Sequence, residues 1–239
     1  MKKPLGVLLL HGFTGLPETV NGLVPHLEAE GLPYRMPAMR GHFTKPEDLV
    51  GVTWRDWVDD AAKALDDLFT EVDRVVIVAL SMGCLVALKI AMERPQNLAG
   101  MVLVAPALRF ADPLTAFTPL LSMVAKFWPM PKPPKECAYE AKNYPYFPTK
   151  TFASFQDFTR HIEVNLPQVQ VPVCLMHSKT DKTIQWISSQ IIHDRVASTD
   201  KALHWFEHSG HEMMMDREKE RVFDLTMAFI RARTPAVEA

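Results

Sequence analysis

The sequence is poor in cysteine and in net charge, and both absences narrow the classes of protein to which it can belong. Its 239 residues include three cysteines, Cys84, Cys137 and Cys174, which are widely spaced and form no CxxC arrangement. This pattern supports neither a disulfide framework nor a zinc site, and it predicts reduced thiols. The formal net charge of −2 gives no electrostatic reason to expect nucleic acid or an anionic membrane as a partner.

Long apolar runs and internal repeats are also missing. No run approaches the ~20 apolar residues that span a bilayer. The start of the chain is basic and then apolar, which superficially resembles a secretory signal, but the apolar run stops at His11 and lacks a small-residue cleavage site. We therefore expect a buried strand there and a cytoplasmic protein. With 48% hydrophobic and 23% charged residues, the composition is that of one globular domain, with room for an insertion.

The most informative stretch is residues 75–88, in which a run of β-branched apolar residues changes to helical spacing. The first half suits a strand buried in a parallel sheet, and the second half suits a helix. A turn this tight needs small residues two positions either side of its centre, and Ala79 and Gly83 flank Ser81 in this way. The pattern corresponds to the G-x-S-x-G turn, with alanine for the first glycine, in which the serine hydroxyl stands at the amino end of a helix. A buried serine at an ordinary strand-helix junction is the alternative.

Strand and helix patterns alternate on both sides of this turn, which predicts an α/β fold with a mostly parallel central sheet flanked by helices. The buried strands are expected at residues 5–10, 34–36, 75–80, 101–104, 173–177 and 203–206. The helices are expected at residues 17–30, 54–69, 82–94, 186–192 and 216–230.

The alternation is interrupted between residues 107 and 166, which contain two proline-rich patches and two short helical patterns, at 114–127 and 151–166. Connections in compact α/β domains usually have ~2–6 residues, so this segment is predicted to be a cap. The expected division is a core of residues 1–106 and 167–239 and a cap of residues 107–166. The cap is rich in apolar residues that can wall a pocket, although most of them would only bury the cap against the core: Phe117, Leu120, Leu121, Met123 and Phe127.

Four groups of polar residues follow directly after predicted strands. They are residues 11–15, Ser81, Asp181 and His211. Because the carboxyl ends of parallel strands meet at one edge of the sheet, these groups should lie together. A serine hydroxyl becomes a good nucleophile when a base takes its proton, and the base needs a carboxylate to fix its tautomer. The two glycines in residues 11–15 allow backbone N–H groups to turn toward a bound oxygen.

These motifs, namely His11-Gly12-Phe13-Thr14-Gly15, Ala79-Leu80-Ser81-Met82-Gly83, Lys179-Thr180-Asp181 and Ser209-Gly210-His211, resemble those of the α/β-hydrolase superfamily. Within it, the chain is similar to small bacterial carboxylesterases and monoacylglycerol lipases. The resemblance runs from about residue 6 to residue 230 and is weakest in the cap, which would be inserted after the strand ending near Val104.

The resemblance implies a role for each matching residue. Ser81 would be the nucleophile, His211 the general acid-base and Asp181 the carboxylate that orients it. The backbone N–H groups of Phe13 and Met82 would form the oxyanion hole. The alanine at position 79 concerns the packing under the turn and leaves the chemistry intact.

No metal or organic cofactor is needed for this chemistry, and the expected partner is a small-molecule ester with an apolar acyl group. The sequence leaves the oligomeric state open between monomer and dimer. Five residues are expected to contact the substrate: Phe13, Met82, Leu108, Phe117 and Leu121.

Other histidines are weaker candidates for the base. His208 precedes the Ser209-Gly210 pair, whereas His211 follows it. His42 is interpreted as a surface or loop-bracing residue rather than as a second active-site histidine. His177 is expected to end a strand near the site.

Other acids compete with Asp181 less well. Asp200 comes before a strand and so lies at the wrong edge of the sheet. Glu212 and Asp216 are expected at the start of the last helix, where acidic residues interact favourably with the helix dipole.

The sequence therefore predicts a serine hydrolase of short- to medium-chain carboxylic esters, with monoacylglycerols among its candidate substrates. Two alternatives stay open. One is related chemistry on the same scaffold, by a thioesterase, an acyltransferase or a carbon–carbon bond hydrolase. The other is a non-catalytic ligand-binding protein on this fold, because fold and function are separable.

Overall fold

The computed structural model describes residues 3–130 and 143–234, and it contains a six-stranded parallel sheet. The strand order is β2-β1-β3-β4-β7-β8, and every neighbouring pair is parallel. The strands are β1 (Lys3–Leu10), β2 (Tyr34–Arg35), β3 (Val72–Leu80), β4 (Leu98–Val104), β7 (Val173–Ser178) and β8 (Lys201–Phe206). The α/β class expected from the sequence is confirmed.

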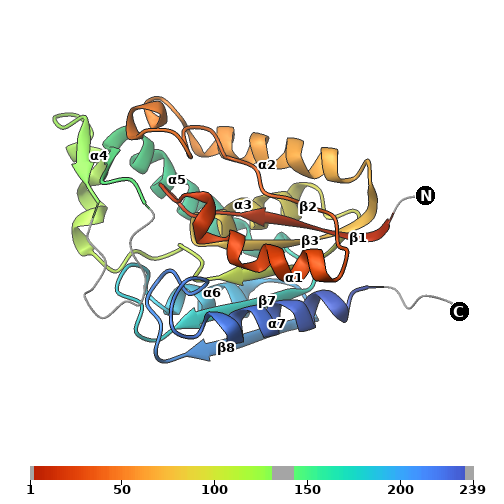
Figure 1. Cartoon of the computed structure of the whole chain (residues 1–239). Coiled ribbons are helices and arrows are strands. Elements are labelled where there is room, and N and C mark those ends of the chain that lie inside the picture. The colour runs from red at the N-terminus through yellow and green to blue at the C-terminus, as the bar shows by residue number, and fades with distance from the viewer. Residues whose placement is uncertain (1–2, 131–142, 235–239) are drawn as a thin grey trace, which may run out of the picture.

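Helices cover both faces of this sheet. They are α1 (Val24–Ala29), α2 (Trp54–Leu68), α3 (Met82–Glu93), α5 (Thr149–Asn165), α6 (Ile187–Arg195) and α7 (Lys219–Arg231). In β1, residues 5, 7 and 9 pack with α1 and α7, whereas residues 8 and 10 pack with α2, α3 and α5. This alternation follows from the period-two geometry of a strand. Figure 1 shows α1 and α7 in front of the sheet and α3 behind it.

The central strands are apolar throughout because both of their faces are covered. All residues of β4 and β7 are buried, as are residues 75–80 of β3. Such strands read as continuous hydrophobic runs rather than as an alternating pattern. The carboxyl ends of these strands point to the same end of the molecule, where the short helix α4 (Thr118–Leu121) lies (Figure 1).

Two expected helices differ from those observed. Residues 17–30 form two 3-10 turns, Pro17–Thr19 and Asn21–Leu23, before α1 begins at Val24. Gly22 lies in this break, and a Cβ atom there would lie 2.9 Å from the ring of Phe223, so the backbone approaches α7 closely. The last helix begins at Lys219 rather than at residue 216.

The segment 107–166, expected as a cap, leaves the sheet after β4 and returns to it at β7. It contains a 3-10 helix (Pro113–Phe117), α4, two short antiparallel strands, β5 (Phe127–Pro129) and β6 (Tyr146–Pro148), and α5. The helical pattern at 114–127 is thus realised only as two short pieces. Residues 131–142, which include Cys137 and part of the proline-rich stretch, lie outside the described residues.

Candidate active site

Ser81 lies in the turn between β3 and α3, in a backbone conformation that few residues adopt. Its φ is 55° and its ψ is −115°, and the side chain is 7% exposed. A non-glycine residue at positive φ is held there only by its surroundings. Gly83 is part of those surroundings, because a Cβ atom on it would lie 2.5 Å from the Leu10 carbonyl oxygen. The local sequence therefore produces a tight strand-turn-helix junction that presents the Ser81 hydroxyl.

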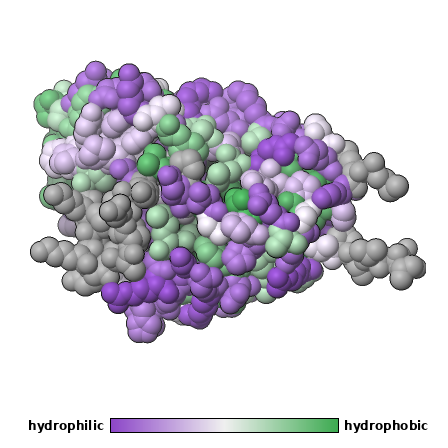
Figure 2. Space-filling view, in the orientation of Figure 1, coloured by the Kyte–Doolittle hydropathy of each residue, from purple (hydrophilic) through white to green (hydrophobic). Residues whose placement is uncertain are grey.

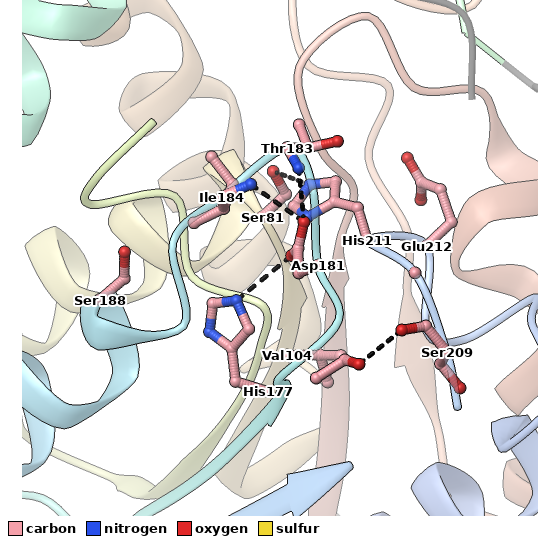
Figure 3. A network of polar contacts seen from close by, with 12 residues as sticks. Ser81, Val104, His177, Asp181, Thr183, Ile184, Ser188, Ser209, His211 and Glu212 are labelled. Atoms are coloured by element: carbon pink, nitrogen blue, oxygen red, sulfur yellow. Dashed lines mark hydrogen bonds and ion pairs between the residues drawn. The ribbon is translucent and has the colours of Figure 1, made fainter. Parts of the chain in front are cut away.

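The Ser81 hydroxyl is hydrogen-bonded to a histidine and, through it, to a carboxylate (Figure 3). Ser81 Oγ lies 2.9 Å from His211 Nε2, and His211 Nδ1 lies 2.8 Å from Asp181 Oδ2. Because an ionised carboxylate only accepts, Nδ1–H donates to Asp181 and Nε2 is free to accept the serine proton. Three residues from three separate segments thus form one continuous hydrogen-bonded chain.

Asp181 accepts four hydrogen bonds, two at each carboxylate oxygen. Oδ1 accepts the backbone N–H groups of Thr183 (2.8 Å) and Ile184 (3.0 Å). Oδ2 accepts from His211 and, at 3.2 Å, from Nε2 of His177. Burial raises the pKa of Asp181, but the charge of His211 and the hydrogen bonds from both histidines outweigh burial and lower that pKa well below its ordinary value.

The surroundings of His211 favour its charged form. Burial alone lowers the pKa of His211, but the charge and hydrogen bond of Asp181, together with the charge of Glu212, raise it above its ordinary value. Burial also raises the pKa of the Glu212 carboxyl. Glu212 accepts a 3.3 Å hydrogen bond from Asn143 Nδ2, and its second carboxylate oxygen is buried without a partner in the described part of the chain.

The loop after β1 lies beside the serine turn. A Cβ atom on Gly12 would lie 3.2 Å from Ser81 Cβ. Within residues 3–130 and 143–234, no backbone acceptor is paired with the N–H of Phe13. Met82 is the first residue of α3, so its N–H has no acceptor within that helix. Neither N–H group is thus paired with a backbone acceptor among the described residues.

Two buried histidines, whose rings pack at a tilt of 59°, support this loop. Met39 N–H donates to His11 Nε2 (3.2 Å), so the His11 Nδ1–H donates to the Gly12 carbonyl (2.8 Å). The ring of His42 lies 4.7 Å from the ring of His11, and His42 Nδ1 bonds the Met39 carbonyl at 2.9 Å. Burial lowers the pKa of His42 to about 4 and lowers the pKa of His11 well below its usual range. Of the two roles expected for His42, the structure supports bracing of the loop and not a surface position, since His42 is buried and bonded to the loop backbone.

The residues expected to contact substrate divide into a buried group and an exposed one. Phe13 packs edge-on or tilted against Trp57, Phe147, Phe152 and Phe155, at ring-centroid distances of 5.4–5.8 Å. Met82 and Leu108 are buried in the same apolar cluster.

Leu121 and Phe117, both in the segment 107–166, are placed differently from each other. Leu121 lines a small cavity of about 30 Å³ together with Phe147 and Phe152. Phe117 is 58% exposed, and its side chain lies on the surface. Apolar surface of this kind appears in Figure 2 at the left edge, where α4 lies in Figure 1.

The competing acids and histidines are placed elsewhere or bonded differently. Asp200 precedes β8 and pairs with Arg233 at 2.7 Å, far from the carboxyl edge of the sheet. His208 is exposed, and its backbone N–H donates to Glu218. Asp216 does not begin the last helix, since its carboxylate accepts the N–H groups of Gly210 and Arg217 and so holds the turn after His211.

His177 has a contact that the sequence did not predict. It was expected only as a strand-end residue near the site, and it is fully buried and hydrogen-bonded to Asp181. Its position four residues before Asp181, as a polar residue at the end of a buried apolar strand, was the available signal.

The described residues contain neither a metal-binding cluster nor a membrane-spanning helix. Among them, no three His, Cys, Asp or Glu side chains gather in an arrangement that can hold a metal ion, and Cys84 and Cys174 are free thiols. No helix in residues 3–130 or 143–234 combines the length and the apolar character that crossing a membrane requires.

Two proteins and one solved structure are similar to this chain over most of its length. A carboxylesterase of Bacillus subtilis (strain 168) is 27% identical over 226 residues, which cover 94% of this chain and 91% of that protein. A thermostable monoacylglycerol lipase of Bacillus sp. (strain H-257) is 26% identical over 231 residues, which cover 95% of this chain and 90% of that protein. A solved structure from work on LipS and LipT, two metagenome-derived lipolytic enzymes, superimposes with a TM-score of 0.90 at 27% identity, covering 97% of this chain and 95% of that one.

The sequence pattern of one family covers most of the chain. The family described as serine aminopeptidase, S33, matches residues 3–218. With a parallel sheet, a serine turn and a histidine loop in the expected order, this chain belongs to the serine aminopeptidase S33 family and has the α/β-hydrolase fold.

Proposed function

We propose that this protein is a serine hydrolase that cleaves carboxylic esters through an acyl-enzyme on Ser81. The observation that carries the proposal is the hydrogen-bonded chain from Ser81 Oγ through His211 to Asp181, with distances of 2.9 and 2.8 Å. The printed names of the relatives, a carboxylesterase and a monoacylglycerol lipase, support an ester as the substrate class.

In the proposed reaction each of the three residues has one part. His211 Nε2 takes the proton of Ser81 as the hydroxyl oxygen attacks the acyl carbon. The charged His211 that results is stabilised by Asp181, and it then gives its proton to the leaving alcohol. Water attacks the acyl-enzyme with the same histidine as base, which releases the acid and restores Ser81.

The oxyanion of the tetrahedral intermediate would accept hydrogen bonds from the N–H groups of Phe13 and Met82. Met82 N–H lies at the amino end of α3, where the helix dipole adds a favourable partial charge. Removing one donor from such a hole typically lowers turnover by ~10²–10³. The loop after β1 is therefore assigned to the catalytic machinery.

The acyl group would lie against the apolar cluster around Phe13, under a cap formed by residues 107–166. The aromatic rings of Phe147 and Phe152 line both this cluster and the small cavity bounded by Leu121. Because one methylene in an apolar pocket is worth only ~1–3 kcal/mol, the preference for acyl length should be graded. Phe117 is left out of the proposed pocket because of its exposure.

We propose short- to medium-chain acyl esters, with monoacylglycerols among them, as the substrates. A cytoplasmic location stays a prediction from the sequence.

The test is hydrolysis of p-nitrophenyl esters of increasing acyl length, run beside monoacylglycerols, an acyl thioester and amino-acid p-nitroanilides. Ser81→Ala is the control. Ser81-dependent hydrolysis of the esters, faster than that of thioester and anilide, is expected. Faster thioester or anilide cleavage would reassign the substrate class, and no Ser81-dependent turnover of any member would favour a ligand-binding protein.

A further inference from the structure

The carboxylate of Asp181 is shared by two histidines, and only one of them touches the serine. Both side chains bond the same oxygen, Oδ2, at 2.8 Å for His211 and 3.2 Å for His177. Figure 3 shows His177 reaching Asp181 from below while His211 approaches from the Ser81 side. His177 takes no part in the ester hydrolysis proposed for Ser81, His211 and Asp181.

His177 is held so that it donates to Asp181. Its Nδ1 lies 2.8 Å from the hydroxyl of Ser189, which belongs to α6. Because the carboxylate can only accept, His177 Nε2 carries the proton, and Nδ1 then accepts from the Ser189 hydroxyl. His177, Ser189 and the Asp181 side chain are all fully buried, so water does not compete for these bonds.

We propose that His177 and Ser189 form a positioning pair that fixes the Asp181 carboxylate and limits how strongly it attracts the proton of His211. This inference rests on the proposed function, since it assigns a role within the Ser81–His211–Asp181 chain. Among the described residues, the side chain of His177 is hydrogen-bonded to Ser189 and Asp181 and not to Ser81, so we expect it to act through Asp181.

The His177–Ser189 pair should keep the pKa of the base, His211, lower than it would be without the pair. A hydrogen bond donated to Oδ2 disperses the negative charge that would otherwise be directed wholly at His211. Removing that bond makes Asp181 a stronger partner for charged His211 and raises the pKa of His211. Besides Asp181, the charge of Glu212 also raises the pKa of His211. The variants described below leave Glu212 unchanged.

Two substitutions of His177 separate positioning from packing. In His177→Gln the amide N–H₂ can reach the position of Nε2 and still donate to Asp181, whereas His177→Leu keeps the bulk but has no donor. A hydrogen bond to a charged group is worth ~1.5–3 kcal/mol, which corresponds to about a ten- to a hundredfold change. We expect His177→Leu to lose about that factor in kcat with little change in KM, and His177→Gln to recover most of it.

The pH profile of kcat/KM gives the readout that a purely structural role would not change. Activity requires neutral His211, so it falls as pH drops through the pKa of the base. We call this fall of kcat/KM at low pH the acid limb of the profile. We expect the acid limb to move to higher pH in His177→Leu and to stay near the wild-type position in His177→Gln.

Two smaller substitutions, at Ser189 and Ser188, test the same inference if the His177 variants do not fold. Ser189→Ala removes the hydroxyl that sets the tautomer of His177. Ser188→Ala removes a neighbouring, equally buried hydroxyl, which bonds the backbone N–H of Arg109 instead. We expect an upward shift of the acid limb in Ser189→Ala but not in Ser188→Ala, with similar losses of thermal stability.

The outcomes separate this inference from the proposed function. Ser81-dependent ester hydrolysis by the wild type tests the proposed function by itself. If the wild type hydrolyses esters while the Leu and Gln variants lose activity equally, with no shift of the acid limb, the positioning role is overturned and His177 is a packing residue.

Discussion

Replacing Gly83 with alanine tests whether the packing under the serine turn controls stability and rate together. A Cβ atom there would lie 2.5 Å from the Leu10 carbonyl oxygen and 2.7 Å from the His11 carbonyl oxygen. Ordinary van der Waals contact begins at 3.4 Å, so the turn and the end of β1 must separate by about 0.9 Å. Both oxygens belong to the backbone and cannot rotate away.

The consequences follow from what lies next to these oxygens. Forcing extra atoms into a well-packed core costs ~1–3 kcal/mol of the free energy of unfolding. The displaced segment leads directly to Phe13, whose N–H group would move away from that of Met82. A misplacement of ~1 Å in a catalytic arrangement lowers the rate by ~10²-fold. We therefore expect Gly83→Ala to lose stability by about 1–3 kcal/mol and kcat by about 10²-fold.

The assay combines urea unfolding with kcat for a p-nitrophenyl ester. Gly51→Ala is the matched control, because Gly51 has a φ of +84° but no atom within 4 Å of the added Cβ. That variant should lose ~1–2 kcal/mol through its left-handed backbone and keep its kcat. Wild-type kcat in folded Gly83→Ala would refute the link between this packing and the oxyanion site.

Three further predictions concern ionisable groups of the site. Asp181→Asn should stay folded by circular dichroism but lose kcat by about 10⁴-fold, because an amide favours the wrong tautomer of His211; a loss below tenfold would contradict its assigned role. His42 has a lowered pKa when folded, so the stability it adds is present above the unfolded pKa of 6.5 and is lost as pH falls toward about 4. That loss is about 3 kcal/mol, and because buried His11 titrates in both proteins, the loss of stability from pH 7 to 4 in urea unfolding should be larger by about this amount in the wild type than in His42→Asn. Glu212→Gln removes a charge that raises the pKa of His211, so the acid limb of kcat/KM should move to lower pH, opposite to His177→Leu; an upward shift would show the attribution to be wrong.

The sheet and the edge of the sheet that holds the site were predictable from the sequence. Buried parallel strands such as β4 are continuous apolar runs, and the residue after each strand necessarily lies at the carboxyl edge. For this reason Ser81, Asp181 and His211 could be expected to lie together before any distance was known.

Features that depend on contacts between distant segments were not predictable. Phe117 was expected to line the pocket because it is apolar, but the side of a short helix that faces the core depends on how the segment 107–166 packs. Asp216 looks like a helix start, whereas its carboxylate accepts the N–H of Gly210 and the helix begins later. The second hydrogen bond to Asp181 arises because α6 brings Ser189 against His177, and sequence spacing does not show that contact.

Covalent labelling would show directly whether Ser81 is the nucleophile of ester hydrolysis. The protein would be treated with a fluorophosphonate and examined by peptide mass spectrometry while ester hydrolysis is followed in the same sample. We expect one adduct, on Ser81, formed in proportion to the loss of activity and absent from Ser81→Ala. Labelling of a different residue with loss of activity, or full activity after Ser81 is labelled, would contradict it.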